Sequence, residues 1–233
     1  IGDKNPRIAF VYPDQRYGKG ALKAARERAR QYGIKLTAEV VLNHGVVDAS
    51  SQVMALKKAK ADYVFICGHI SQMPALYKSM KTYSYDPYVF GVHLICNESI
   101  VPRLGEQTKK FIGIHFLSGW NSDAPGIKLA KNLVKKYNTD LTGKPTGFYT
   151  YGMGVIMVMV EGLKRAGRDL TLDKLRASLE TFRGWDAYGV LAPLTFTSTN
   201  HMGPTKLSVF KTDPAKKQLV QVGWRTPLKL GEK

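Results

Sequence analysis

The sequence predicts an α/β fold built on a doubly wound parallel sheet, with additional helices that belong to a second, incomplete lobe. Short apolar runs rich in β-branched and aromatic residues alternate with segments of helical periodicity over the first half of the chain. These runs are continuously apolar, as expected for strands covered by helices on both faces. From residue 119 onward, three helical segments follow one another without an intervening strand. Together, these observations favour a parallel sheet followed by a separate helical part.

The first half of the chain is expected to contain five strands and three helices. The strands are expected at residues 7–12, 35–42, 62–68, 88–93 and 111–117, and the helices at 20–33, 48–61 and 73–83. Gly33 provides a C-terminal stop for the first helix, and Asp48 is placed to cap the second. Strands connected through helices form parallel βαβ units with right-handed crossovers.

The second half is expected to be helical and then antiparallel. Helices are expected at residues 124–137, 152–167 and 171–182, and antiparallel strands within 193–224, where apolar and polar residues alternate. The middle helix is apolar nearly all round, so it must pack against other elements. The helices therefore either form a small subdomain or pack on a sheet that these 233 residues do not contain.

Composition argues against several classes of protein. The net charge of +17 comes from basic residues spread along helices that also carry apolar stripes, so we interpret it as solvated helix surface and expect no nucleic-acid partner. The apolar runs are shorter than the roughly 18 residues of a membrane span. The chain begins almost directly in a strand, as expected of a mature form whose signal peptide has been removed, or of a fragment.

The sequence carries no motif for catalysis or for a cofactor. It has no GxSxG elbow, no P-loop and no GxGxxG after the first strand, so we expect neither an enzyme nor a bound cofactor. The two cysteines, Cys67 and Cys96, form no zinc-binding pattern. They follow neighbouring strands, which leaves the question of a disulfide open.

Candidate ligand contacts follow the ends of the predicted strands. In open α/β sheets, ligands bind outside the carboxyl ends of the parallel strands. Three of the five histidines end three successive apolar runs, and Gly68 and Gly91 beside them allow close backbone approach. The candidates at this edge are Tyr17, His69, Ser71 and His93, joined by His115 and Trp120 farther along the chain.

The histidines have three competing interpretations. His69, His93 and His115 bind a metal ion, or they hydrogen-bond a small organic ligand, or each is a satisfied histidine near the core. The sequence has no HxH, HxxxH or HExxH spacing that supports a metal, so none is predicted. For His115, which is followed by Phe116 and Leu117, the core interpretation is favoured.

Four blocks of the sequence occur in this order: RIAFVYPDQRYGKG, VVDASSQVMALKKAKADYVFICG, GFYTYGMGVIMVMVEGLKRAG and GVLAPLTFTSTNHMG. They resemble successive blocks of the branched-chain amino acid type of solute-binding protein. These type I periplasmic binding proteins deliver ligands to ATP-binding-cassette (ABC) importers. The resemblance covers nearly the whole chain, and it implies a periplasmic, non-enzymatic protein that serves a membrane permease.

The resemblance also implies two α/β lobes that close on a ligand through a hinge. Residues 1–118 resemble the second lobe of the family, residues 119–184 the helical part of the first lobe, and residues 185–233 a β-rich return to the second lobe with a C-terminal tail. Most of the first lobe is then absent from this chain. Its helices are expected to swap, to dimerise, or to pack on a separately present first lobe.

Site residues carry over from the family only where positions match. Tyr17 matches an aromatic residue that covers the ligand, and His69 and Ile70 match a position that lines the cleft. His93 falls where amino-acid-binding members carry an acid that holds the ammonium group of the ligand. Histidine cannot supply that negative charge, so the substitution favours a carboxylate-bearing ligand, aliphatic or aromatic, over a free amino acid.

Two alternative functions stay open at this point. A ligand-sensing receptor domain would share the same fold. A metal-dependent enzyme would use the histidines at the strand ends.

Overall fold

The computed structural model describes residues 5–137, 140 and 147–226. Within this part, the chain forms two compact units. Unit 1 comprises residues 5–114 and 210–219, and unit 2 comprises residues 115–137, 140, 147–209 and 220–226. The elements in chain order are β1 (Ile8–Tyr12), α1 (Arg16–Gln31), β2 (Ala38–Val41), α2 (Ser50–Lys58), β3 (Tyr63–Ile66), the 3₁₀ turn η1 (Ile70–Gln72), α3 (Met73–Thr82), β4 (Tyr88–Gly91), α4 (Ile100–Leu104), the 3₁₀ turn η2 (Gly105–Thr108), β5 (Phe111–His115), α5 (Pro125–Tyr137), α6 (Gly147–Ala166), α7 (Leu172–Leu179), β6 (Leu207–Asp213) and β7 (Gln218–Arg225).

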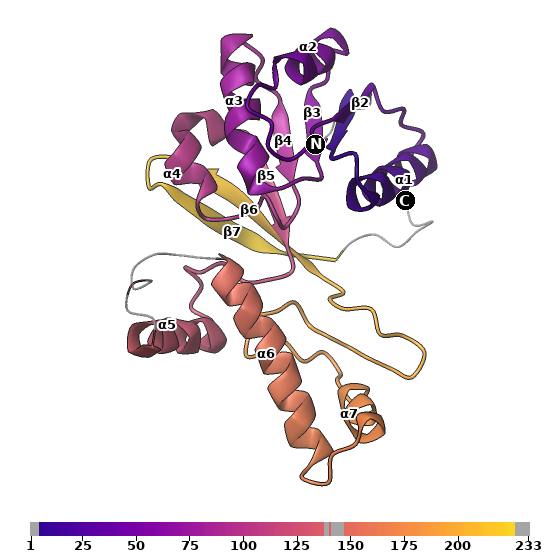
Figure 1. Ribbon diagram of the computed structural model, residues 1–233, viewed down its shortest axis with the longest axis vertical. Coiled ribbons are helices and arrows are strands. Elements are labelled where there is room, and N and C mark those ends of the chain that lie inside the picture. The colour runs from indigo at the N-terminus through magenta and orange to yellow at the C-terminus, as the bar shows by residue number, and fades with distance from the viewer. Residues whose placement is uncertain (1–4, 138–139, 141–146, 227–233) are drawn as a thin grey trace. The chain divides into compact units, whose positions relative to one another are not determined.

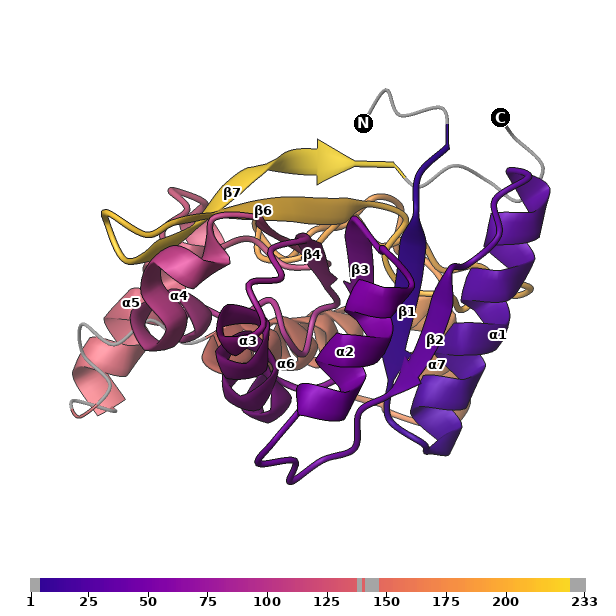
Figure 2. The same cartoon turned by 90° about the horizontal axis from the view of Figure 1, so that it is seen from above.

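The strands form one sheet in the order β2-β1-β3-β4-β5-β6-β7. The pairs formed among β1 to β5 are parallel, with Ala9 of β1 opposite Ala38 of β2 and Val64 of β3. Figure 2 shows β2, β1, β3 and β4 in this order. The direction of winding reverses at β1, which is the arrangement of a doubly wound sheet. The predicted fold class is therefore confirmed.

Alternating residues of β1 contribute to two different cores in unit 1. Ala9 and Val11 belong to a large apolar cluster that also contains residues of α2 and α3. Phe10 instead packs with Leu22 of α1 and with Cys67. Because successive side chains of a strand point to opposite faces, α1 covers one face of the sheet and α2 and α3 cover the other. Figure 1 shows α2 and α3 together and α1 apart from them.

The helices of unit 1 differ from expectation in several respects. Helix α1 begins at Arg16, four residues before the expected start. The sequence did not reveal this start because Gln15, at the N-cap, is not one of the residue types that usually cap helices. Helix α2 begins at Ser50, and Asp48 accepts the backbone N–H of Ser50 at 2.8 Å, one residue before the N-cap position. The short helix α4 was not expected at all.

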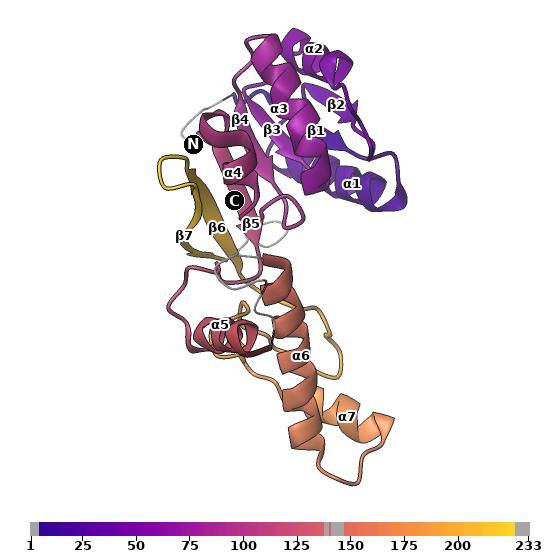
Figure 3. The same cartoon turned by 60° about the vertical axis from the view of Figure 1, so that its left-hand side comes forward.

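Unit 2 contains the helices α5, α6 and α7. The side of α6 that faces the rest of the unit carries small residues. A Cβ atom added to Gly162 would lie 2.7 Å from Leu179 of α7, and the hydroxyl of Ser178 donates to the carbonyl of Gly162 at 2.7 Å. Figure 3 shows α7 beside the C-terminal half of α6. Glycine therefore allows the two helices to approach closely.

The opposite side of α6 is apolar and exposed within this chain. Its large exposed side chains recur every three or four residues, which places them along one face of the helix. They are Phe148, Tyr151, Val155, Ile156, Met159, Val160 and Leu163. This exposed apolar face agrees with the expectation that the helix requires a packing partner.

The C-terminal part contains fewer strands than its alternating pattern predicts. Residues 193–206 form only isolated bridges in the described structure, among them Leu194 with Pro204 and Thr197 with Asn200. Proline has no N–H to donate to a continuous ladder, and this limits pairing here. The strands β6 and β7 are neighbours in the sheet joined by a short turn, so they form an antiparallel hairpin. Residues 185–209, expected with the sheet-bearing lobe, cluster with unit 2.

Candidate functional site

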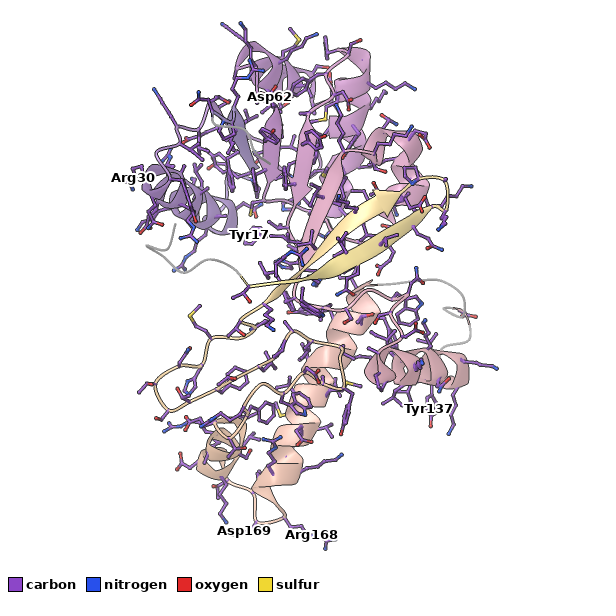
Figure 4. All side chains as sticks on the ribbon, turned by 180° about the vertical axis from the view of Figure 1, so that it is seen from behind. Tyr17, Arg30, Asp62, Tyr137, Arg168 and Asp169 are labelled. Atoms are coloured by element: carbon purple, nitrogen blue, oxygen red, sulfur yellow. The ribbon has the colours of Figure 1, made fainter. Side chains whose placement is uncertain are left out.

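Loops after the parallel strands of unit 1 carry most of the candidate contact residues. Tyr17 follows β1, His69 and Ser71 follow β3, and His93 follows β4. These strands are parallel, so their carboxyl ends lie along one edge of the sheet. Figure 4 shows Tyr17 at one end of unit 1 and Asp62, which precedes β3, at the other. The structure therefore brings these four candidates to a common edge.

Tyr17 lies in the first turn of α1, where a glycine holds the helix against the loop before it. A Cβ atom added to Gly18 would lie 2.1 Å from the carbonyl oxygen of Pro13, so only glycine fits this position without rearrangement. The hydroxyl of Tyr17 shares a hydrogen bond with the thiol of Cys67. The pKa of Tyr17 is raised, mainly by burial and to a smaller extent by this hydrogen bond. Tyr17 stays 44% exposed, so its ring is available to a ligand.

His69 begins the turn η1 and is held there by its own neighbours. Its backbone N–H donates to the side-chain amide oxygen of Gln72 at 2.6 Å. Its Nδ1 atom accepts the backbone N–H of Ser71 at 3.3 Å and lies 3.1 Å from the Ser71 hydroxyl. Ile70 is half-buried and donates its N–H to the carbonyl of Leu94 at 3.2 Å. The bond between Ile70 and Leu94 links the loop after β3 to the loop after β4.

His44 belongs to the same edge and was missed in the sequence. It follows β2, and its ring lies 5.9 Å from the ring of His69, centroid to centroid, with an interplanar angle of 63°. The rule that directs attention to strand ends applies to His44 as well. However, the polar residue Asn43 separates His44 from the apolar run, so His44 was not recognised as a strand-end residue in the sequence.

His93 is half-buried beyond the end of β4. Burial lowers its pKa, so the imidazole is neutral near pH 7. The glycines near His69 and His93 make room for protein side chains. Cβ atoms at Gly68 and Gly91 would lie 2.5 Å from Gln72 and 2.7 Å from Phe111 respectively. Their role is therefore internal packing, in place of the expected close approach to a ligand.

His115 and Trp120 lie in unit 2 and are buried there. His115 is 9% exposed, and its Nδ1 atom accepts the backbone N–H of Phe116 at 2.9 Å. Trp120 packs with Ala130 and Val134 in a small cluster of unit 2. Both residues therefore belong to a different unit from the four candidates at the edge of unit 1.

The histidines and cysteines do not assemble a metal site in the described part of the chain. No group of three or more potential ligands occurs among the described residues. Cys67 and Cys96 are both free and buried, and burial raises the pKa of each thiol. The cysteines are therefore core residues that form no disulfide with each other. The interpretation of the histidines as metal ligands has no geometric support among the described residues.

Two hollows of unit 1 lie away from these residues. One, of about 200 Å³, is lined by residues that include Tyr77, Tyr85 and Gln107. The other, of about 260 Å³, lies under the C-terminal half of α1 and is lined by residues that include Phe10 and Phe65. No described helix has both the length and the apolar character needed to cross a membrane.

Comparison with known proteins gives a consistent family. Residues 2–218 match the family model described as periplasmic binding protein. A leucine-, isoleucine-, valine-, threonine- and alanine-binding protein of Pseudomonas aeruginosa is 25% identical over 204 residues, covering 83% of this chain and 52% of that protein. A Leu/Ile/Val-binding protein of Citrobacter freundii is 26% identical over 203 residues, covering 83% of this chain and 53% of that protein. The chain thus spans about half the length of the curated relatives it matches.

Solved structures agree on the fold. A branched-chain amino acid ABC transporter protein from Thermus thermophilus, solved with bound valine, has a TM-score of 0.87 at 19% identity over 97% of this chain and 62% of that one. A fatty acid ABC transporter substrate-binding protein from Thermomonospora curvata has a TM-score of 0.77 at 24% identity, over 94% of this chain and 57% of that one. The curated relatives are named as binding proteins, which agrees with the expected non-enzymatic role.

Proposed function

Because the chain belongs to the type I periplasmic binding proteins, in the branched-chain amino acid binding family, we propose that it is part of the solute-binding component of an ABC importer. The protein would act in the periplasm and deliver its solute to a membrane permease. The observation that carries the proposal is the common edge of unit 1, where Tyr17, His69 and His93 follow three parallel strands. Side chains that converge at strand ends are the usual means by which such sheets bind small molecules.

The mechanism we propose is hinge closure. The lobe that contains unit 1 closes with its partner lobe on the solute, and the solute favours the closed state through the additional contacts that it makes there. Tyr17 supplies an exposed aromatic face. His69, Ser71 and His93 supply hydrogen-bonding groups, and Ile70 supplies apolar surface.

The solute class follows from the charge of His93. The family resemblance implies an acid at this position in amino-acid binders, and a carboxylate binds an ammonium group through charge-assisted hydrogen bonds. The His93 imidazole is neutral near pH 7 because burial lowers its pKa, so it offers hydrogen bonds without a negative charge. This supports a solute with a carboxylate and without an ammonium group at this end, either an aliphatic or an aromatic acid.

Helix α6 supports a further part of the proposal, which concerns association. Its exposed apolar face, defined above, is larger than a scatter of single surface residues. We propose that this face is covered by the remainder of the first lobe in the whole protein. Light scattering on the 233-residue chain tests this: we expect self-association of the chain alone, and a well-behaved monomer would count against it.

Calorimetric titration tests the solute class. The protein as the cell makes it, with any segments that flank these residues, is titrated with 4-methylpentanoate, phenylacetate, leucine and valine. We expect the two carboxylates to bind more tightly than the two amino acids. Tight binding of leucine would refute the argument from His93, and failure of the whole panel to bind would refute the proposed function for this class of solute.

A further inference from the structure

We propose that the hollow beside Tyr77 is a second small-molecule site, which binds a neutral ring compound that carries a hydroxyl group, such as a simple phenol. This hollow is the one of about 200 Å³ in unit 1. The inference goes beyond the proposed function and does not depend on it. It is carried by a buried hydroxyl group in the wall of the hollow and by the chemistry of the groups around it.

The hollow lies at the edge of the sheet opposite to the candidate solute contacts. Its lining comes from the C-terminal half of α3, from the loop before β4 and from Gln107 in the turn before β5. Because β3, β4 and β5 are parallel, segments that precede these strands lie at their amino ends. Tyr17, His69 and His93 instead follow the carboxyl ends of their strands. A ligand in the hollow would therefore leave the solute edge free.

Tyr77 carries a polar group that has no partner among the described residues. The residue is 4% exposed, and its hydroxyl oxygen is buried without a hydrogen bond in this part of the chain. A buried hydroxyl that lacks a partner is costly, and most such groups in proteins do have one. Burial raises the pKa of Tyr77, and the carboxylate of Asp86 raises it further, so the side chain is a neutral phenol near pH 7. Tyr77 therefore has a hydroxyl proton to donate to an occupant of the hollow.

The walls around this hydroxyl are held in place by bonds to the main chain. The backbone N–H of Tyr85 donates to the carbonyl of Met80 at 2.9 Å, and the hydroxyl of Tyr85 donates to the carbonyl of Ala61 at 2.6 Å. The ammonium group of Lys110 donates to the backbone carbonyl of Asp86 at 2.9 Å and lies 2.8 Å from the carboxylate of the same residue. The loop between α3 and β4 is thus fixed to three other segments, and the hollow is a built feature of the unit.

The lining determines the class of ligand. Tyr77, Met80 and Val89 contribute mainly carbon atoms, and an apolar cavity of about 150 Å³ is already large enough to bind benzene. The oxygen of a ligand hydroxyl can accept the proton of Tyr77, and the ligand can donate its own proton to the carboxylate of Asp86. A carboxylate ligand would bring a second negative charge beside Asp86, and an ammonium ligand would meet the positive charge of Lys81. A neutral phenol avoids both repulsions.

The ligand reaches the buried hydroxyl by displacing flexible side chains. Met80 is unbranched and adapts its shape readily, and Lys81 is exposed and can turn toward solvent. These movements leave the main-chain bonds of the loop before β4 intact. Binding therefore requires an adjustment of side chains and no rearrangement of the fold.

The first test locates the binding. The protein as the cell makes it is titrated with phenol, and its methyl groups are followed in ¹H–¹³C spectra. We expect the methyl signals of Met80 and Val89 to shift, and those of Ile70 at the solute edge to stay in place. Unchanged signals from Met80 and Val89 at the highest phenol concentration at which the protein stays folded would overturn the proposal.

The second test removes the hydroxyl alone. We expect Tyr77→Phe to weaken phenol binding by about threefold to tenfold, the loss of one hydrogen bond. Toluene is the matched probe, since it has the shape of phenol without the hydroxyl, and its affinity should not fall in Tyr77→Phe. An equal loss for both probes, or no loss for phenol, would show that the Tyr77 hydroxyl does not recognise the ligand and would overturn the proposal.

The third test asks whether the Tyr77 hydroxyl already has a partner. Tyr85→Phe is the matched control, because it removes a hydroxyl that bonds Ala61 in the lining of the same hollow. Without ligand, we expect Tyr77→Phe to leave the midpoint of urea denaturation unchanged or raised, and Tyr85→Phe to lower it. If both variants lower the midpoint equally, the Tyr77 hydroxyl is already satisfied, for example by an ordered water, and the proposal is overturned.

Discussion

Two glycines of helix α1 are expected to respond in opposite directions to the same substitution. A Cβ atom at Gly18 would lie 2.1 Å from the carbonyl oxygen of Pro13 and 2.7 Å from its Cδ atom. A Cβ atom at Gly20, two residues farther along the helix, would meet nothing within 4 Å among the described residues. The pair separates the effect of packing from the effect of helix propensity.

The magnitudes follow from these distances. Alanine is favoured over glycine inside a helix by about 0.8–1 kcal/mol, so Gly20→Ala should raise the free energy of unfolding by up to that amount. Overpacking a well-filled site costs about 1–3 kcal/mol. Since the clash at Gly18 is with a backbone oxygen, we place it toward the upper end of that range. Gly18→Ala should therefore lower the free energy of unfolding by roughly 1–2 kcal/mol after the gain in propensity.

Urea denaturation of both variants, followed by circular dichroism, measures the difference. Gly18→Ala should also weaken solute binding, because the shift displaces Tyr17 in the first turn of α1 and its hydrogen bond with Cys67. Gly20→Ala should leave binding unchanged. If Gly18→Ala proves as stable as Gly20→Ala, the close approach of α1 to Pro13 does not constrain the helix, and the explanation for the position of Tyr17 is wrong.

Three further predictions concern other parts of the chain. Burial lowers the pKa of His93 below the unfolded value of 6.5, so the unfolded state binds a proton at a higher pH than the folded state does. The free energy of unfolding should therefore fall as the pH drops below about 6.5 toward the folded pKa. Denaturation measured at several pH values should show this loss in the parent protein and not in His93→Gln. Cys67 and Cys96 should resist a thiol reagent at pH 8 until the protein unfolds, since both are buried with a raised pKa; rapid labelling of native protein would contradict this. Ile156→Lys on the exposed face of α6 should reduce self-association of the 233-residue chain in light scattering, while changing its stability by less than about 0.5 kcal/mol; unchanged association would exclude this face as the contact.

The sheet could be predicted from the sequence because its strands are continuous apolar runs. Tyr63 to Ile66 illustrates this, since a short β-rich run between helical segments has few other structures available. The start of α1 could not be placed, because Gln15 carries no capping preference and the glycine contact with Pro13 is a tertiary feature. The strands expected in residues 193–206 follow an alternating pattern that the prolines interrupt.

The candidate site was only partly predictable. The strand-end rule located Tyr17, His69 and His93, because the rule depends only on where apolar runs stop. The contact made by Gln72 could not be predicted in this way, because its side-chain amide donates to the carbonyl of Leu42, thirty residues earlier in the chain. Trp120 also follows an apolar run, and the sequence did not show that its surroundings in unit 2 bury it.

The buried amide of Gln72 has a practical consequence for redesign. It bonds the carbonyl of Leu42 and the backbone N–H of His69, so it joins the loops after β2 and β3 through main-chain groups. Because these two bonds involve only main-chain atoms of the loops, substitution of exposed side chains on the loops should leave their backbone in place.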